Sequence, residues 1–186
     1  LRATEGVCTA AGCGGCVYQH IKYEHEAKLK RDYVENAFRK AGLADVRVGE
    51  LRHTGELTRY RNKAQYPIAR AKNGSYIIGF YAPKSHRVTE ARKCPLAPPV
   101  FAEILDTLAA FFEKQDLSCY DEESGKGLLR HIYLRAGEAT GEYMLCLVIN
   151  GDSIVSFNNI LGLEIKKDQV KLFKENHVVG NHLVVD

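Results

Sequence analysis

The chain of 186 residues is long enough for one ordinary domain, or for one domain with an additional segment. Hydrophobic residues make up 45% and charged residues 26%, a balance that excludes an intrinsically disordered chain. No apolar run approaches the roughly 20 residues of a membrane span, and residues 1–10 lack the pattern of a signal peptide. We therefore expect a cytoplasmic protein with no membrane partner. Because the chain begins without an initiator Met, we also expect it to be a segment of a longer protein.

The net charge of +3 conceals a strong asymmetry along the chain. Residues 1–100 carry 18 Lys and Arg against 9 Asp and Glu, whereas residues 101–186 carry 8 against 14. A basic half of this kind is typical of proteins that bind a polyanion such as nucleic acid. A solvated basic surface without any partner explains the charge equally well.

The first predicted element is a long amphipathic helix at residues 17–41, which follows a loop rich in Gly and Cys at residues 1–16. Its apolar side chains recur at helical spacing, and Gly42 suits the position just after the last turn. This stripe has no evident partner in the chain, so we expect it to be exposed or to pack against a second copy. Its main members are Ile21, Leu29, Tyr33 and Phe38.

Residues 57–82 predict a β-hairpin, because two strand-like segments flank the strong turn signal Asn73-Gly74. Alternation in the first strand places its long polar side chains on one face, namely Arg61, Lys63 and Gln65. Pro67 lacks a backbone N–H, which predicts an edge strand or a bulge at this point. Residues 84–93 are then interpreted as a polar loop that leads to Cys94-Pro95.

A second helix is predicted at residues 100–114, directly after Pro98-Pro99, since proline suits the first turn of a helix. Its apolar stripe consists of Phe101, Leu105, Leu108 and Phe112, with Ile104 and Phe111 beside it. A second hairpin follows, in which LLRHIYLR and YMLCLVIN flank AGEATGE. The segment YMLCLVIN is almost wholly apolar and is therefore predicted to be a central strand covered on both faces.

This order of elements predicts an α+β fold with a mainly antiparallel sheet built from β-hairpins and two principal helices. Residues 170–186 predict further strands with a turn at Gly180-Asn181. We expect two parts: residues 1–42, holding the Cys-rich loop and the long helix, and residues 43–186, a central α+β domain that supplies Cys94.

Three cysteines near the N-terminus, Cys8, Cys13 and Cys16, have the spacing C-x4-C-x2-C, and Cys94 precedes a proline much later. Glycines at positions 12, 14 and 15 allow the backbone to wrap tightly around one centre. Cys16 is expected just before the long helix, where the helix dipole favours a thiolate. The pattern resembles that of ferredoxin-type iron–sulfur proteins more than a zinc ribbon. Zinc and buried inert thiols remain alternatives, and Cys146 and Cys119 are interpreted as structural.

Four motifs in order, CGGCVYQHIKYEHEAKLK, YRNKAQYPI, GFYAPKSHRV and KCPL, resemble the iron–sulfur branch of the RNA (uracil-5-)-methyltransferases. Bacterial members of that branch make 5-methyluridine in 23S ribosomal RNA. The resemblance covers nearly the whole chain, although some members have one more residue between the first two cysteines. It implies a [4Fe-4S] cluster held by Cys8, Cys13, Cys16 and Cys94.

The resemblance also implies which parts of the enzyme lie elsewhere. The family's N-terminal β-barrel domain has no counterpart in this sequence. The C-terminal domain that binds S-adenosylmethionine and carries the catalytic Ser-Cys-Asn-Pro segment has none either. No catalytic residue is therefore expected in this chain, which is predicted to be inactive alone. A self-contained RNA-binding module, stapled by zinc or a cluster and without enzymatic activity, is the alternative.

An RNA-contacting surface is expected on the two hairpins, because unstacking a target uridine requires positive charge and stacking groups. For each of these side chains taken alone, an ordinary exposed charge explains the residue equally well, and the group is more convincing than any single member. The predicted RNA-binding residues are Arg59, Arg61, Lys63, Lys84, His86, Arg87 and Arg130, with Tyr60, Tyr81 and His131 among them.

Overall fold

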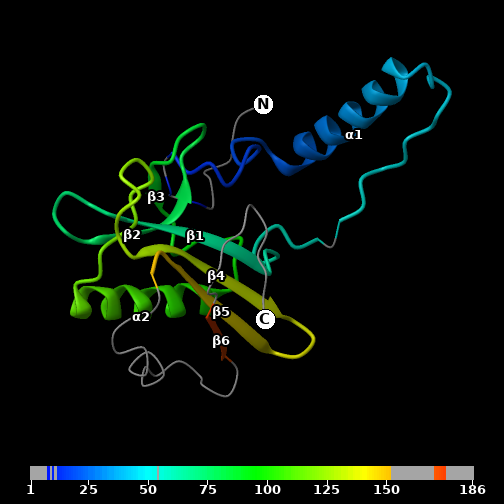
Figure 1. Cartoon of the computed structure of the whole chain (residues 1–186). Coiled ribbons are helices and arrows are strands. Elements are labelled where there is room, and N and C mark those ends of the chain that lie inside the picture. Colours follow the sequence, from blue (N-terminus) through cyan, green and yellow to red (C-terminus); the bar gives the residue numbers. More distant parts are fainter. Residues whose placement is uncertain (1–7, 9, 11, 54, 152–169, 175–186) are drawn as a thin grey trace. The chain divides into compact units, whose positions relative to one another are not determined.

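The computed structural model describes residues 8, 10, 12–53, 55–151 and 170–174. It contains two helices, α1 (Tyr23–Lys40) and α2 (Pro99–Gln115), among these residues (Figure 1). The strands are β1 (Lys63–Arg70), β2 (Tyr76–Tyr81), β3 (Val88–Glu90), β4 (Leu129–Gly137), β5 (Glu142–Ile149) and β6 (Val170–Lys174). The predicted α+β class is confirmed, whereas the predicted turn at Gly180-Asn181 lies outside the described residues. No helix in the described part of the chain is long and apolar enough to cross a membrane.

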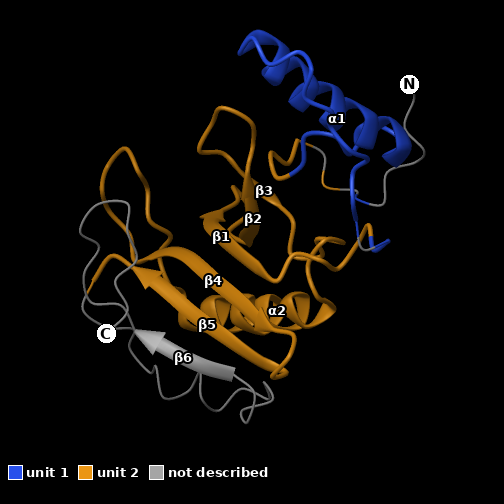
Figure 2. Ribbon diagram, turned by 90° about the vertical axis from the view of Figure 1, so that its right-hand side faces the viewer, with its two compact units in different colours: residues 1–9, 16–56 blue, residues 10–15, 57–186 orange. Residues whose placement is uncertain are grey.

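The chain forms two compact units, shown in different colours in Figure 2. The first unit comprises residues 1–9 and 16–56, and the second comprises residues 10–15 and 57–186. The boundary expected after residue 42 therefore falls inside the first unit. Residues 10–15 belong to the second unit, so the Cys-rich loop is divided between the two.

The second unit is built on one sheet with the strand order β3-β2-β1-β4-β5-β6. The first hairpin is confirmed: β1 pairs antiparallel with β2, and the turn places Gly74 at a φ of 88°. However, β1 is not an edge strand, because Lys63–Pro67 pair with β4 while Ile68–Arg70 pair with β2. Pro67 lies where β1 changes partner. Proline has no backbone N–H to donate, and it is tolerated at this position because the hydrogen bonds to β4 end here and those to β2 begin.

One face of this sheet is covered by α2, whose apolar stripe is buried as predicted (Figure 1). Pro99 occupies the first turn of the helix, and Asp116 ends it in a left-handed conformation with a φ of 47°. Alternate residues of the strands complete the core on this face. They are Ala64, Tyr66 and Ile68 of β1, Tyr76 and Ile78 of β2, Ile132, Leu134 and Ala136 of β4, and Leu145 and Leu147 of β5.

The second hairpin is confirmed, with β4 and β5 antiparallel and β5 lying between β4 and β6. Residues 145–148 are buried without interruption, as expected of a strand covered on both faces. Two features were not predicted. Strand β6 runs parallel to β5, and β3 forms within the segment expected to be a polar loop. Val88 and Thr89 of β3 are buried, and three residues of β3 pair with β2. This burial and strand pairing stabilise a strand within a segment whose other residues are mostly polar.

In the first unit, α1 begins at Tyr23, later than the predicted residue 17. It ends in a Schellman motif, in which Leu43 N donates to Phe38 O and Gly42 N donates to Arg39 O. Six residues therefore separate Cys16 from the first residue of α1, and the predicted dipole effect on that thiol stays a prediction. No residue of α1 is buried, and Tyr33 is 77% exposed. The described residues of the first unit therefore leave the stripe of α1 uncovered, in agreement with the expected exposure.

Candidate metal centre and nucleic-acid interface

A short loop of the second unit, residues 12–15, is bound to the end of β2 and to β3 around Cys13. The backbone N–H of Gly14 donates to Tyr81 O at 3.0 Å, and Thr89 Oγ1 donates to Gly12 O at 3.3 Å. A Cβ atom at position 14 would lie 2.6 Å from Tyr81 O, which no real Cβ tolerates. Glycine is therefore required at position 14 by close backbone approach, and this contact holds Cys13 beside the sheet.

The sulfur of Cys13 has donors suited to a thiolate. Gly15 N donates to Cys13 Sγ at 3.4 Å, the kind of backbone contact that stabilises sulfur ligands of metal centres. Arg61 donates from its guanidinium to Gly15 O at 3.1 Å and lies 5.2 Å from the centre of the Phe80 ring. The surroundings of Cys13 thus fit a metal-bound thiolate.

Cys94 lies in the same unit, at the end of the loop that follows β3. Just after Cys94, the chain is hydrogen-bonded to the segment that precedes β1. Arg59 N donates to Pro95 O at 2.9 Å, and Arg61 N donates to Leu96 O at 2.7 Å. Cys94 is half-buried and packs against the core cluster that contains Tyr66. Burial raises the pKa of Tyr66, and the charge of Cys94 raises it further, while Arg61 lowers it. Cys94 and Arg61 therefore both act electrostatically on one buried phenol.

The other two predicted ligands, Cys8 and Cys16, belong to the first unit, and both are half-buried. Gln19 Nε2 donates to the backbone oxygen of Cys8 at 3.4 Å. Among the residues that the structure describes, no three His, Cys, Asp or Glu side chains form a group that would hold a metal. The four-cysteine site accordingly stays a prediction.

The two remaining cysteines have the character expected of structural thiols. Cys146 is 3% exposed on β5. Cys119 packs against the core, and burial raises its pKa to about 11. A thiol with so high a pKa is almost fully protonated at neutral pH, so it is a poor nucleophile.

We predict that Gly14→Ala destabilises the second unit by about 1–3 kcal/mol, because the new methyl group must displace the backbone of residues 81–83. Denaturant unfolding of the variant and the wild type measures this cost. Gly49→Ala is the matched control, since a Cβ at position 49 meets nothing within 4 Å. Equal stability of the two variants would show that residues 12–15 are not held against β2.

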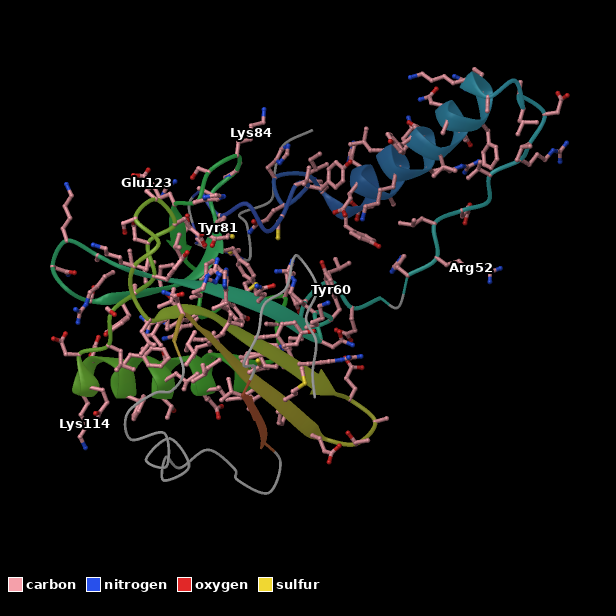
Figure 3. All side chains as sticks on the ribbon, viewed as in Figure 1. Arg52, Tyr60, Tyr81, Lys84, Lys114 and Glu123 are labelled. Atoms are coloured by element: carbon pink, nitrogen blue, oxygen red, sulfur yellow. The ribbon has the colours of Figure 1, made fainter. Side chains whose placement is uncertain are left out.

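The predicted RNA-binding residues divide into two groups by their contacts. Arg59, Lys63, Lys84, His86 and Arg87 are exposed. Figure 3 shows Lys84 and Tyr81 on the part of the second unit away from Lys114 of α2. Tyr81 is half-buried, and its ring centre lies 5.5 Å from that of His86. This group combines free positive charge with an aromatic ring.

The second group has protein partners instead. Arg61 holds the loop at residues 12–15, as described above. Arg130 donates to Glu122 Oε1 at 3.1 Å and lies over the Tyr120 ring at 4.3 Å. His131 is joined to Tyr81 by a hydrogen bond of 3.2 Å, and both burial and Arg130 lower its pKa. His131 is therefore neutral at pH 7 and adds no positive charge, and RNA contact by these three residues stays a prediction.

Two further residues of this surface were missed by sequence reasoning, Tyr133 and Arg135 on β4. The register pairs Lys63 with Arg135 and Gln65 with Tyr133, so all four share the face opposite α2. Lys63 Nζ lies 5.7 Å from the centre of the Tyr133 ring. The alternation of LLRHIYLR shows in the sequence that Tyr133 and Arg135 lie on one face of their strand. That this is the same sheet face as Lys63 follows only from the pairing of β1 with β4.

Comparison with known proteins gives relatives for most of the chain. No protein-family model matches. A protein of Clostridium tetani named an uncharacterized RNA methyltransferase is 40% identical over 136 residues, which is 73% of this chain and 29% of the relative. A protein of the same description from Nostoc sp. is 34% identical over 154 residues, covering 82% of this chain and 34% of the relative. One from Staphylococcus aureus is 33% identical over 140 residues, covering 75% and 31%.

The fold is similar to that of a solved structure, the Pyrococcus abyssi tRNA (uracil-54, C5)-methyltransferase in complex with S-adenosyl-L-homocysteine. The TM-score is 0.69 over 93% of this chain and 39% of that one, at 21% identity, so this likeness concerns the fold. The chain spans about a third of the length of the curated relatives it matches. The chain is thus similar to a segment of proteins named RNA methyltransferases, which confirms the resemblance drawn from its motifs at that level.

Proposed function

We propose that this chain is the central, RNA-contacting part of an S-adenosylmethionine-dependent RNA uracil-C5 methyltransferase that acts on 23S ribosomal RNA in the cytoplasm. The carrying observation is the 33–40% identity to proteins named RNA methyltransferases over 136 to 154 residues. The likeness of fold to a tRNA uracil methyltransferase supports the uracil-C5 assignment. The first unit does not bury the apolar stripe of α1 with its own residues, so this stripe offers a surface on which another part of a longer protein can pack.

In this proposal the chain binds RNA and another part of the enzyme performs the chemistry. Methylation at C5 of uracil needs an activated nucleophile held against the base. Cys119, with its raised pKa, and buried Cys146 do not fit that role. If the other four cysteines hold a metal group, none of them is available as a nucleophile either. We therefore expect no methyl transfer by this chain alone, and S-adenosylmethionine binds the part of the enzyme that lies elsewhere.

We further propose that Cys8, Cys13, Cys16 and Cys94 hold a [4Fe-4S] cluster. Two features of the second unit support it, the N–H of Gly15 directed at Cys13 Sγ and the Arg61 guanidinium beside that loop. When bound, the cluster supplies a cross-link between distant parts of the chain. Such a link stabilises the fold because it closes a long loop in the unfolded chain.

The RNA surface in this proposal is the part of the sheet face opposite α2 that β1 and β4 form, together with the turn between β2 and β3. Lysine and arginine side chains there contact phosphates, while Tyr81 and Tyr133 provide rings on which unstacked bases stack. The two parts of the surface are connected, because β2 and β4 both pair with β1. Binding through such a surface depends strongly on salt, since each phosphate contact releases counterions.

We expect the triple variant Lys63→Ala, Lys84→Ala and Arg87→Ala to bind a folded ribosomal RNA fragment more weakly and with a flatter salt dependence. Each lost phosphate contact lowers the slope of log affinity against log salt by about 0.7–0.9. Filter binding or fluorescence anisotropy at several salt concentrations measures this slope. Arg61 is left unchanged because its replacement also releases the loop at residues 12–15.

The matched control removes the same charge from exposed positions outside the proposed surface: Lys72→Ala, Lys114→Ala and Lys126→Ala. This control is expected to keep most of the wild-type slope. If both triple variants lose slope equally, only net charge matters and the proposed surface is wrong. Methylation of uridine by the isolated chain would contradict the proposal that another part of the enzyme performs the chemistry.

A further inference from the structure

Gln65 of β1 carries an exposed side-chain amide on the face of the sheet opposite α2. Its neighbours along the strand, Ala64 and Tyr66, are buried in the core on the other face. Among the described residues, none forms a hydrogen bond with this amide. An amide offers two N–H donors and a carbonyl acceptor side by side. Gln65 is thus a polar recognition group that the described part of the fold does not use.

The aromatic ring of Tyr133 lies directly across from Gln65. The register pairs the two residues on β1 and β4, and side chains that face each other in this way are neighbours. Tyr133 is half-buried, and Lys63 Nζ lies 5.7 Å from the centre of its ring. The contact of an exposed lysine with a ring is weaker than the stacking of a base on that ring. A base can therefore replace the lysine on Tyr133.

The residues on either side of this pair complete the surroundings that a nucleotide needs. On one side lie Lys63 and Arg135, which pair with each other across β1 and β4 and are both exposed. Two adjacent cations suit the phosphates that flank a base. On the other side lies His131, whose ring is hydrogen-bonded to the Tyr81 hydroxyl at 3.2 Å. A nucleotide whose base covers Tyr133 thus has cations for its phosphates in the next row of the sheet.

We propose that Gln65 and Tyr133 form a subsite for one unpaired nucleotide of the RNA, in which the base stacks on Tyr133 and its Watson–Crick edge pairs with the Gln65 amide. This inference rests on the RNA-contacting role proposed above. The nucleotide differs from the target uridine, whose base has to reach the part of the enzyme that performs the chemistry. In a duplex the Watson–Crick edge is already paired and the base is stacked between its neighbours, so paired RNA does not fill the subsite. The subsite accordingly selects RNA with an unpaired loop or end.

The variants Gln65→Leu and Tyr133→Leu test this in the whole chain. The probes are a ribosomal RNA hairpin with an unpaired loop and a fully paired RNA duplex with the same number of nucleotides, both measured by fluorescence anisotropy. We expect each variant to lose about tenfold in affinity for the hairpin, because a pair of hydrogen bonds or a stacked base is lost. Affinity for the duplex and the salt dependence should stay as in the wild type, since no charge is removed. Tyr133→Phe keeps the ring and is expected to retain hairpin binding.

Gln115→Leu is the matched control, because it makes the same change on α2, away from this face of the sheet. It is expected to bind both RNAs as the wild type does. Suppose that both leucine variants bind the hairpin like the wild type, while the triple variant of Lys63, Lys84 and Arg87 binds it more weakly. That result would overturn the subsite and leave the proposed RNA surface intact. An equal loss on hairpin and duplex would overturn the subsite too, since a duplex offers no free base edge. A wild-type chain that binds neither RNA would overturn the RNA-contacting role itself.

Discussion

Cys94→Ser is expected to abolish the brown colour of anaerobically purified protein and to reduce its iron content by at least tenfold. Serine replaces a soft thiolate with a hydroxyl that binds iron poorly, so the cluster loses the one ligand that comes from far along the chain. The stability of the purified protein should fall as well, by about 2–4 kcal/mol if the cluster acts like other cross-links that close long loops. Visible absorbance, iron analysis and thermal unfolding provide the three measurements.

The control for this experiment is Cys146→Ala, which removes a thiol from β5 and should leave the colour unchanged. Metal analysis of the wild type separates the two kinds of centre. About four iron atoms and four sulfides per chain support the cluster, whereas one zinc per chain identifies a zinc-stapled module instead. Full iron content in the Cys94→Ser variant would show that Cys94 is not a ligand.

Phe112→Ala is expected to destabilise the second unit by about 3–5 kcal/mol, a large fraction of the stability of a domain of this size. Phe112 of α2 is 0% exposed, and its ring centre lies 5.8 Å from that of Tyr76 and 6.1 Å from that of Phe111. Truncation removes buried apolar surface and leaves a cavity at the contact between helix and sheet. Denaturant unfolding, monitored by circular dichroism, measures the difference.

Tyr33→Ala on α1 is the contrasting variant, because Tyr33 is also a large aromatic on an amphipathic helix but is 77% exposed. Its loss should change the stability of this chain by no more than about 0.5 kcal/mol. A cost above about 2 kcal/mol would mean that the stripe of α1 is buried in solution, for example against a second copy.

The two helices show what the periodicity of apolar residues can and cannot predict. Both were predicted from an apolar stripe, and both formed with bounds close to those expected at their C-terminal ends. The stripe of α2 is fully buried, while that of α1 has no buried residue. Hydrophobic spacing depends only on neighbours along the chain, so it predicts that a helix forms but not what covers it.

Some features of the candidate site were likewise visible in the sequence, whereas others arise only from contacts in the folded chain. The spacing of Cys8, Cys13 and Cys16 in a Gly-rich loop was visible in the sequence, and so was the basic group around Lys84 and Arg87. Sequence reasoning could not find that Arg61 holds the loop of Cys13 or that Glu122 pairs with Arg130. Each of these contacts joins side chains that only the folded backbone brings together.

What the sequence determined by itself was therefore local: two amphipathic helices, two hairpins, the first with its turn at Asn73-Gly74, the cysteine motif, and the resemblance to RNA methyltransferases. The tertiary structure decided the rest. It placed β1 inside the sheet with a change of partner at Pro67, added β3, and aligned β6 parallel to β5. It also buried the Tyr66 hydroxyl without a hydrogen-bond partner among the described residues. The physical reason is that strand pairing and burial depend on contacts between residues distant in the chain, which no short sequence window contains.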